Sequence, residues 1–196
     1  IRLVAATDMS VMIFGENGTG KEHIAHHLHD KSKRAGKPFV AVDCGSLTKE
    51  LAPSAFFGHV KGAFTGADST KKGYFYEAEG GTLFLDEVGN LALETQQMLL
   101  RAIQERRYRP IGDKSDRSFN VRIIAATNED LEAAVSEKRF RQDLFYRLHD
   151  FGITVPPLRD CQEDILPLAE FFREIANKEL ECNVSGFSSE ARKALL

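Results

Sequence analysis

A glycine-rich run near the start of the chain has the spacing of a phosphate-binding loop. It reads Gly15, Glu16, Asn17, Gly18, Thr19, Gly20, Lys21 and Glu22, and so contains the pattern G-x-x-x-x-G-K. Glycines let backbone amides turn toward phosphate oxygens, the start of a following helix adds its positive dipole end, and Lys21 supplies a mobile cation. The alternative is a glycine-rich turn with a solvated lysine. It is disfavoured because a predicted strand precedes the run and a predicted helix follows it.

Glu22 stands where such loops usually carry a serine or threonine that ligates magnesium. A carboxylate beside phosphates is repelled unless a metal ion or water lies between them. The run therefore predicts nucleotide binding more directly than it predicts magnesium coordination.

Two carboxylates end a second motif, Gly80 to Glu87, which reads Gly-Gly-Thr-Leu-Phe-Leu-Asp-Glu. The apolar residues predict a strand, and open α/β sheets bind ligands at the carboxyl ends of their strands. Asp86 could hold Mg²⁺ directly or through water, and Glu87 could orient and deprotonate the water that attacks a γ-phosphate. Many strands end in acids, so this motif alone is weak. Paired with the glycine-rich run, it predicts ATP hydrolysis.

Short apolar runs alternate with longer segments of helical period, which is typical of a parallel sheet covered by helices. We predict an α/β fold with strands at Val11–Phe14, Phe39–Asp43, Thr82–Asp86, Val121–Thr127 and Gly152–Val155. We predict helices at Lys21–His29, Leu93–Gln104, Leu131–Glu137 and Glu163–Glu179. Asp130 and Ser188 are the expected N-caps. Almost forty residues separate the second strand from the third, so we expect an insertion there, and Pro156-Pro157 is the expected domain boundary.

Composition excludes several classes of protein. The 196 residues are 42% hydrophobic and 28% charged, which is typical of a globular domain and not of a disordered chain. No apolar run is long enough to span a membrane, and the start is no signal peptide. Three separated cysteines predict no disulfide framework or zinc cluster and suit a reducing cytoplasm. The net charge of −3 shows no strongly basic face for duplex DNA. The missing initiator Met, and an end inside an apparent helix, indicate an excised fragment.

Taken together, the motifs resemble the AAA+ domain of bacterial sigma-54-dependent transcription activators (enhancer-binding proteins) over the whole chain. Besides Gly15–Glu22 and Gly80–Glu87, the resemblance rests on Gly62-Ala63-Phe64-Thr65-Gly66-Ala67, Phe140-Arg141-x-Asp143-Leu144-x-x-Arg147-Leu148 and Pro156-Pro157-Leu158-Arg159. Gly62–Ala67 is nearly diagnostic, because other AAA+ branches lack it. The resemblance implies a P-loop AAA+ three-layer sandwich with a five-stranded parallel sheet over residues 1–157. The start of a truncated α-helical lid would follow over 158–196.

The resemblance also implies that Gly62–Ala67 is the tip of an inserted loop that touches sigma-54. The sequence agrees in part, since the glycines predict a tight hairpin that presents Phe64 and Thr65. An exposed aromatic residue on such a loop suits a contact that a conformational step could raise or hide. From the residues alone, a glycine turn with Phe64 folded into the core is the favoured alternative.

Further roles are implied residue by residue. Asn128 matches a sensor of the γ-phosphate, or else caps the next helix. Arg141 and Arg147 match arginine fingers that a neighbouring subunit inserts, which requires a ring, expected to be a hexamer; otherwise they pair with Asp143 or Asp150. Asp43 falls where the family carries an Asn or Asp that bonds the catalytic glutamate, and it would repel Glu87. Ala55-Phe56 departs from the family's Glu-Leu before the loop.

Other features predict no chemistry of their own. His23, His26, His27 and His29 are expected to form a partly exposed face of the first helix, with no H-E-x-x-H zinc arrangement. The net-positive stretch Arg101–Arg117 is either a second loop near the ring pore, as the family implies, or a solvated connector. Cys44 is expected to be a small buried hydrophobe.

We therefore predict an ATPase that uses ATP and Mg²⁺ to remodel sigma-54 RNA polymerase holoenzyme at promoters. The chain would touch DNA mainly through a domain absent from it, and would touch no membrane. Two rivals remain: a general AAA+ ATPase acting on another protein or on DNA, and a nucleotide-controlled interaction module without useful turnover.

Overall fold

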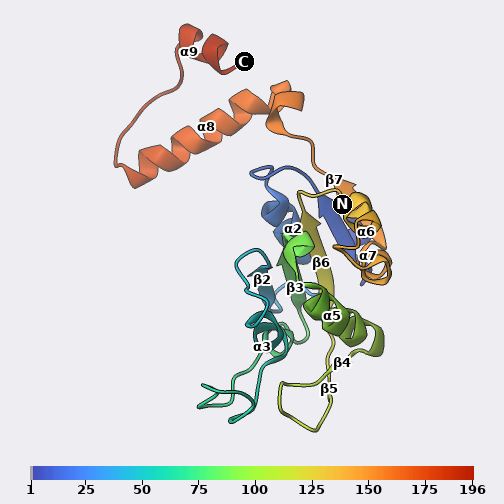
Figure 1. The fold of residues 1–196 in the computed structure, drawn as a ribbon. Coiled ribbons are helices and arrows are strands. Elements are labelled where there is room, and N and C mark those ends of the chain that lie inside the picture. Colours follow the sequence, from blue (N-terminus) through green and yellow to red (C-terminus); the bar gives the residue numbers. More distant parts are fainter. Residues whose placement is uncertain (1) are drawn as a thin grey trace. The chain divides into compact units, whose positions relative to one another are not determined.

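The computed structural model describes residues 2–196, which divide into two compact units, 2–155 and 156–196. The division falls between Val155 and Pro156. In Figure 1 the first unit runs from blue to light orange and holds every strand, and the second unit is helical. No helix among the described residues is long and apolar enough to cross a membrane.

The first unit is built on a five-stranded parallel sheet whose order is β2-β3-β6-β1-β7. Its strands are β1 (Val11–Phe14), β2 (Phe39–Asp43), β3 (Thr82–Asp86), β6 (Arg122–Thr127) and β7 (Phe151–Thr154). All five predicted strands are confirmed, with ends shifted by at most one residue. All six residues of β6 are buried, whereas the edge strand β7 has no fully buried residue, as expected for central and edge positions.

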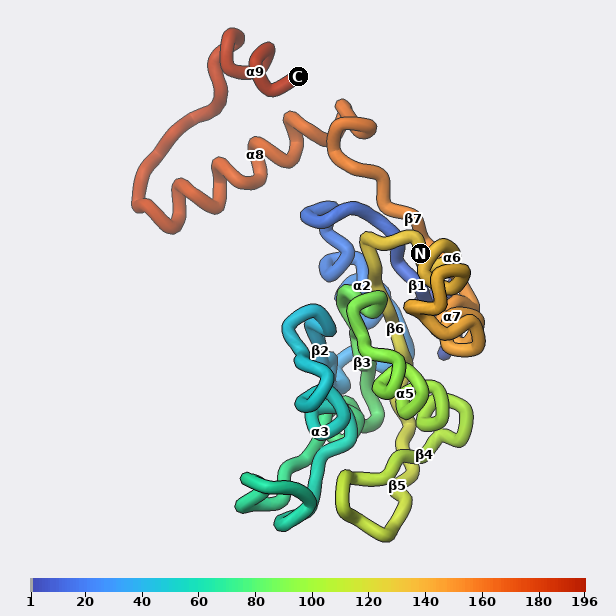
Figure 2. Tube along the Cα trace, in the orientation of Figure 1, coloured from blue at the N-terminus to red at the C-terminus, as the bar shows by residue number. Residues whose placement is uncertain are grey.

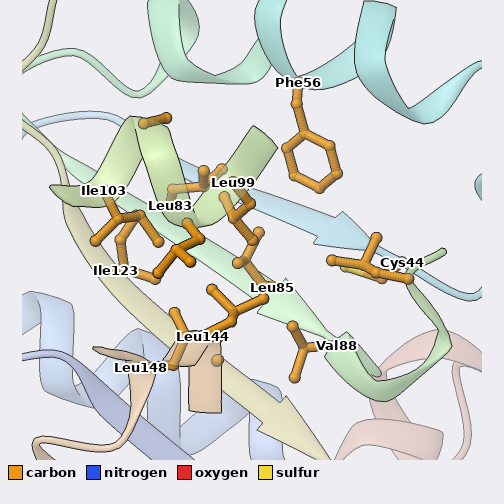
Figure 3. Packing of buried hydrophobic residues seen from close by; sticks show 14 of the residues in the cluster. Cys44, Phe56, Leu83, Leu85, Val88, Leu99, Ile103, Ile123, Leu144 and Leu148 are labelled. Atoms are coloured by element: carbon orange, nitrogen blue, oxygen red, sulfur yellow. The ribbon is translucent and has the colours of Figure 1, made fainter. Parts of the chain in front are cut away.

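Helices cover both faces of the sheet and make three layers. On one face, Met12, Leu83 and Ile123 belong to a large buried cluster with side chains from α3, α5 and α7. Figure 3 shows this cluster, in which Leu83 and Leu85 of β3 gather with Leu99 and Ile103 of α5. On the other face, alternate strand residues such as Ile13 and Ile124 pack with Ala25 and Leu28 of α2. Because successive side chains of a strand point to opposite faces, each buried strand serves both layers.

The helices of the first unit are α1 (Arg2–Ala5), α2 (Lys21–Asp30), α3 (Ala52–Phe57), α4 (Tyr74–Glu77), α5 (Leu93–Glu105), α6 (Leu131–Ser136) and α7 (Gln142–Leu148). A 3₁₀ turn, η1, covers Val88–Asn90. The predicted helices at α2, α5 and α6 are confirmed. Asp130 is confirmed as an N-cap, since its side chain accepts from the N–H groups of Glu132 and Ala133.

The helices α1, α3, α4 and α7 were not predicted from the sequence. Each has only four to seven residues. The expected histidine face also needs correction, because His29 is buried and its Nδ1 lies 2.9 Å from Thr82 Oγ1. His29 sits on the side of α2 that packs on the sheet.

Two inserted segments extend from the same end of the sheet, and Figure 2 shows them in teal-green and yellow-green. The first is the predicted insertion between β2 and β3, which holds α3, α4 and the loop that carries Gly62–Ala67. The second is a short antiparallel hairpin of β4 (Arg107–Tyr108) and β5 (Arg117–Ser118), within the net-positive stretch Arg101–Arg117.

Two buried arginines fix the amino ends of the central strands. The guanidinium of Arg34 donates to Asp8 Oδ1 (2.9 Å), to the carbonyl of Gly81 (3.1 Å), and to both the carbonyl and the side-chain oxygen of Asn120. Arg122 donates to three carbonyls in and just after α1. Gly81 directly precedes β3 and Asn120 lies two residues before β6, so Arg34 ties the starts of both strands to the segment after α2.

The second unit consists of η2 (Leu158–Asp160), α8 (Gln162–Glu179) and α9 (Ser189–Leu195). Ser188 is confirmed as the N-cap of α9, because its hydroxyl accepts from the N–H of Ala191 (3.1 Å). Arg192 of α9 reaches back to Glu170 of α8 (3.1 Å). The assignment of this unit to a helical lid stays a prediction.

Candidate functional site

The glycine-rich loop connects β1 to α2, as its sequence predicts, and is already folded around its own lysine. Gly18 and Gly20 have φ values of 80° and 81°, a left-handed conformation that favours glycine. Lys21 is only 6% exposed, and its Nζ donates to the carbonyls of Gly15 and Glu16, both at 3.0 Å. The ammonium group therefore lies inside the loop, where it can exchange carbonyl partners for phosphate oxygens.

The two acids of the second motif lie at the carboxyl end of β3. Asp86 Oδ1 accepts from the N–H of Glu87 at 3.0 Å. Glu87 has a φ of 51°, which is uncommon for a residue other than glycine and costs of order 1–2 kcal/mol. Because of this turn, the side chains of Asp86 and Glu87 point in different directions. The Glu87 carboxylate accepts a hydrogen bond from Asn90 Nδ2 at 2.9 Å.

Asp43 lies beside these acids, because the β2–β3 register pairs it with Asp86. Its Oδ1 accepts from the N–H of Gly45 (2.8 Å) and of Ser46 (3.3 Å). A Cβ atom on Gly45 would lie 2.6 Å from Glu87 Oε2 and 3.2 Å from Asp43 Oδ1. The structure thus brings both carboxylates against one glycine, but records no hydrogen bond between them among the described residues.

The residues at this edge fit a magnesium ion shared with a nucleotide. Asp86 is half-buried, and the one carboxylate oxygen that accepts a hydrogen bond leaves the other for a hard cation. Within residues 2–196, no group of three or more His, Cys, Asp or Glu side chains could hold a metal ion. An ion here would therefore need phosphate oxygens or water as further ligands. Glu22 is exposed and lies 3.9 Å from His26.

Cys44 follows Asp43 and is fully buried, as predicted. Burial raises the pKa of the Cys44 thiol far above its usual range, and the nearby charges of Asp43, Asp86 and Glu87 raise it further. A thiol that stays protonated is a poor nucleophile. Cys44 therefore contributes to the packing of the hydrophobic core.

Asn128 follows β6, between the phosphate loop and the acids. Together with Gly15, Glu16 and His149 it lines a cavity of about 440 Å³. The carbonyl of Thr127 accepts from the N–H of Gly15 at 3.2 Å, which ties the end of β6 to the loop. The alternative, that Asn128 caps the next helix, is wrong, because Asp130 does so.

The two candidate arginine fingers flank and occupy α7. Arg141 forms a two-pronged ion pair with Asp143, with distances of 2.8 and 3.1 Å. This is the pairing expected of a surface arginine. Arg147 makes no ion pair with Asp143 or Asp150 in the described chain, and its buried Nε has no hydrogen-bond partner there.

Gln96 of α5 has a role that was not predicted from the sequence. It is fully buried, and its Nε2 donates to the carbonyls of Leu91 (2.7 Å) and Arg139 (3.0 Å). Its Oε1 accepts from the N–H of Arg141 at 2.8 Å. Nothing in the local sequence distinguishes this glutamine from the exposed ones on the same helix.

The Gly62–Ala67 motif forms a tight loop, as predicted. The N–H of Gly62 donates to the carbonyl of Ala67 (2.8 Å), and the N–H of Ala67 to that of Phe64 (3.0 Å). Thr65 is exposed and Phe64 is 45% exposed, with its ring edge against His59 at 5.0 Å between centroids. The alternative of Phe64 folded into the core is therefore wrong. This loop extends from the end of the sheet where β3 begins, whereas Asp86 and Glu87 lie where β3 ends (Figure 2).

The β4–β5 hairpin pairs with the base of this loop. Ile111 donates to the carbonyl of Gly58 (2.9 Å) and accepts from the N–H of Val60 (3.1 Å). Gly112 has a φ of 78°, and a Cβ atom there would lie 2.7 Å from Ala63 Cβ. The two inserted segments are thus joined by backbone hydrogen bonds and close packing.

Comparisons with known proteins agree with this architecture. Residues 1–154 match the family described as "Sigma-54 interaction domain". The chain is 49% identical, over 196 residues, to the transcriptional regulatory protein ZraR of Klebsiella oxytoca. It is 50% identical over 195 residues to the alginate biosynthesis transcriptional regulatory protein AlgB of Pseudomonas putida. Both alignments cover 100% of this chain and 44% of the relative, so the chain spans less than half the length of these relatives.

Among solved structures, NtrX from Brucella abortus in complex with ADP superposes with a TM-score of 0.91 and 34% identity, covering 99% of this chain and 42% of that one. Such agreement shows the AAA+ P-loop fold with its five-stranded parallel sheet. With the family matched over more than three quarters of the sequence, the chain belongs to the sigma-54 interaction domain family.

Proposed function

We propose that this chain is the ATP-hydrolysing core of a bacterial transcription activator, which acts on sigma-54 RNA polymerase in the cytoplasm. The single observation that carries the proposal is the edge of the sheet where three elements meet. The phosphate loop follows β1, Asn128 follows β6, and Asp86 and Glu87 lie at the end of β3, so all of them are at this edge. The ADP bound to NtrX supports a nucleotide as the ligand.

The chemistry follows from what each side chain can donate or accept. The left-handed glycines turn the loop backbone so that its N–H groups can approach phosphate oxygens, and Lys21 neutralises the charge of those oxygens. Asp86 is the carboxylate that would hold Mg²⁺, which when bound neutralises charge that develops on the phosphates. Glu87 accepts the proton of the attacking water, and Asn128 bonds the γ-phosphate. With these roles, the water activated by Glu87 attacks the phosphorus atom of the γ-phosphate.

Arg141 and Arg147 act in this proposal on the nucleotide of a neighbouring subunit in a ring. Support comes from Arg147, whose buried Nε has no partner within the described chain. A guanidinium can bind two phosphate oxygens at once and can be worth about 10³–10⁵ in rate. Arg141 would have to exchange Asp143 for phosphate. A hexamer is the expected ring.

Phe64 and Thr65 are the proposed contact with sigma-54. They are exposed on a loop whose base is hydrogen-bonded to the β4–β5 hairpin, so a conformational change could move the tip as a unit. DNA contacts are assigned mainly to a domain outside this chain.

The test replaces Glu87 by Gln in the full-length protein. Phosphate release should fall about 10²–10⁴-fold while ATP still binds, because the amide cannot take a proton. Glu77→Gln, an exposed carboxylate far from the site, is the matched control and should hydrolyse ATP normally. Equal phosphate release by Glu87→Gln and the wild type would refute the catalytic assignment.

The partner is tested separately, with a transition-state-like ADP complex and purified sigma-54. Binding by the assembled wild type, and its loss in Thr65→Ala with hydrolysis retained, would support the proposal. Assembly without sigma-54 binding would favour the general AAA+ rival.

A further inference from the structure

Glu129 directly follows Asn128, the proposed γ-phosphate contact, in the turn that ends β6. The N–H of Glu129 donates to the buried Thr127 Oγ1 at 3.0 Å, and the carbonyl of Thr127 accepts from Gly15 of the phosphate loop at 3.2 Å. Glu129 and Asn128 also line the same cavity beside this loop. A shift of Asn128 on nucleotide binding is therefore passed directly to Glu129.

The carboxylate of Glu129 reaches across to the segment that precedes α7. Its Oε1 accepts from the guanidinium of Arg139, which also binds Glu137 through Nε (2.8 Å) and Nη2 (2.7 Å). A Cβ atom on Gly89, in the turn η1 after β3, would lie 2.6 Å from Glu129 Oε2, so a larger residue at Gly89 would push the carboxylate aside. The ion pair thus runs from the turn after β6, past the turn after β3, to the chain that leads into α7.

Arg139 lies two residues before Arg141 and eight before Arg147, the two proposed arginine fingers. The N–H of Arg139 donates to the carbonyl of Ala134 in α6 at 2.9 Å. The buried carboxamide of Gln96 bonds both the carbonyl of Arg139 and the N–H of Arg141. Because one side chain holds both residues, a displacement of Arg139 is passed to the backbone of Arg141.

The Glu129–Arg139 ion pair should contribute little to the stability of the fold. The two side chains are 30% and 50% exposed, and water and salt weaken pairs of this kind. The pair instead fixes a distance, since it joins the residue before the N-cap of α6 to a residue just after that helix. Its effect is therefore expected in the position of the segment before α7 and not in the free energy of unfolding.

We propose that the Glu129–Arg139 ion pair couples the nucleotide site of one subunit to the arginines that the same subunit offers to its neighbour. Asn128 meets the γ-phosphate, and the pair carries the resulting shift to the segment before α7. The rate at one site then depends on whether the subunit that donates the arginines holds ATP. The inference rests on the proposed function, which takes Asn128 as the γ-phosphate contact and Arg141 and Arg147 as fingers. Glu129 and Arg139 are positioning residues, because they act through these groups.

The test measures ATP hydrolysis by the full-length protein against ATP concentration, with the assembled ring verified by light scattering for each variant. Because two adjacent subunits must hold ATP for one well-placed finger, the wild type should give a Hill coefficient above one, approaching about two. Glu129→Gln and Arg139→Gln should each lower it to about one, with the melting temperature almost unchanged. Arg139→Lys keeps the charge and should retain a coefficient above one.

Glu137→Gln is the matched control for Glu129→Gln. It removes the other carboxylate that binds Arg139 and changes the net charge by the same amount. Glu137, however, is the C-cap of α6, whereas Glu129 belongs to the turn that carries Asn128. Glu137→Gln should therefore keep the Hill coefficient of the wild type.

A wild-type Hill coefficient in Glu129→Gln, or an equal fall in Glu137→Gln, would overturn the inference. An assembled wild-type ring without cooperativity would also overturn it. Loss of the ring in both Glu129→Gln and Arg139→Gln would assign the pair to assembly, against the inference. Failure of the proposed function is seen in a different protein, because Glu87→Gln would then hydrolyse ATP as fast as the wild type, whatever the Hill coefficient.

Discussion

The buried amide oxygen of Gln96 accepts a hydrogen bond from the backbone N–H of Arg141 at 2.8 Å. The same carboxamide donates to the carbonyls of Leu91 and Arg139, so one side chain of α5 makes three bonds to backbone. These bonds fix the chain just before α7, which carries Arg147. A residue of the core thus positions the arginines proposed to act on a neighbour.

Replacement of Gln96 by Leu should destabilise the fold. Three backbone groups would lose their buried partner, and each unsatisfied group costs about 1–3 kcal/mol, so we expect a loss of at least about 2 kcal/mol in the free energy of unfolding. Urea denaturation followed by circular dichroism measures it. Gln104→Leu on the exposed face of the same helix is the control, and equal stability of the two variants would contradict the role of Gln96.

Replacement of Lys21 by Met should weaken nucleotide binding with little effect on folding. Methionine keeps the buried stem but cannot neutralise phosphate, so we expect ATP affinity to fall at least about tenfold. Titration with a fluorescent ATP analogue measures it. Lys31→Met, just beyond the other end of α2, changes the net charge equally and should bind as the wild type. Similar weakening in both variants would mean that total charge, and not the loop, attracts the nucleotide.

Replacement of Gly112 by Ala should uncouple the two inserted segments. The new methyl group would overlap Ala63. Alanine is also strained at the positive φ of this position, which destabilises the folded state further. Gly36→Ala has the same kind of backbone strain, at a φ of 75°, but its new Cβ atom would meet nothing within 4 Å. It is therefore a closely matched control. We expect sigma-54 binding to fall only in Gly112→Ala, with ATP hydrolysis within about twofold of the wild type in both. Equal binding by the two variants would show that the contact is dispensable.

Acidification should destabilise the first unit through His29. Burial is the main cause that lowers the pKa of His29 below the value of 6.5 expected when the chain unfolds. Below that value the unfolded state takes up the proton first, so the stabilising contribution is complete above about pH 6.5 and is lost as the pH falls further. Melting temperatures between pH 7.5 and 5 measure it. His29→Asn should flatten the acid slope, and His27→Asn, on the exposed face, should not.

The strands and the position of the glycine-rich loop between β1 and α2 could be predicted because local sequence determines them. A buried parallel strand needs a continuous apolar run, and the loop needs glycine at Gly18 and Gly20, so both leave a pattern in the chain. The place of Asp86 and Glu87 at the end of β3 could be predicted for the same reason, since they end such a run.

The short helices could not be predicted, because their stability is tertiary. No side-chain cap bond begins α3, α4 or α7, and each is too short to form alone in water. Phe56 and Leu144 are fully buried, and it is this packing that keeps their helices folded. The contacts of Gln96 and Asn90 could not be predicted for a related reason. Their hydrogen-bond partners are set by the folded backbone, and neither residue belongs to a local sequence pattern.

The hydrogen bonds that Arg34 donates to Gly81 and Asn120 have a mechanical consequence. Helix α2 carries Lys21 at one end, and at its other end the chain is fastened to the starts of two central strands through Gly81 and Asn120. These bonds oppose displacement of the carboxyl end of α2 relative to β3 and β6. We therefore expect nucleotide binding and release to move the turns that follow β3 and β6 more than they move α2.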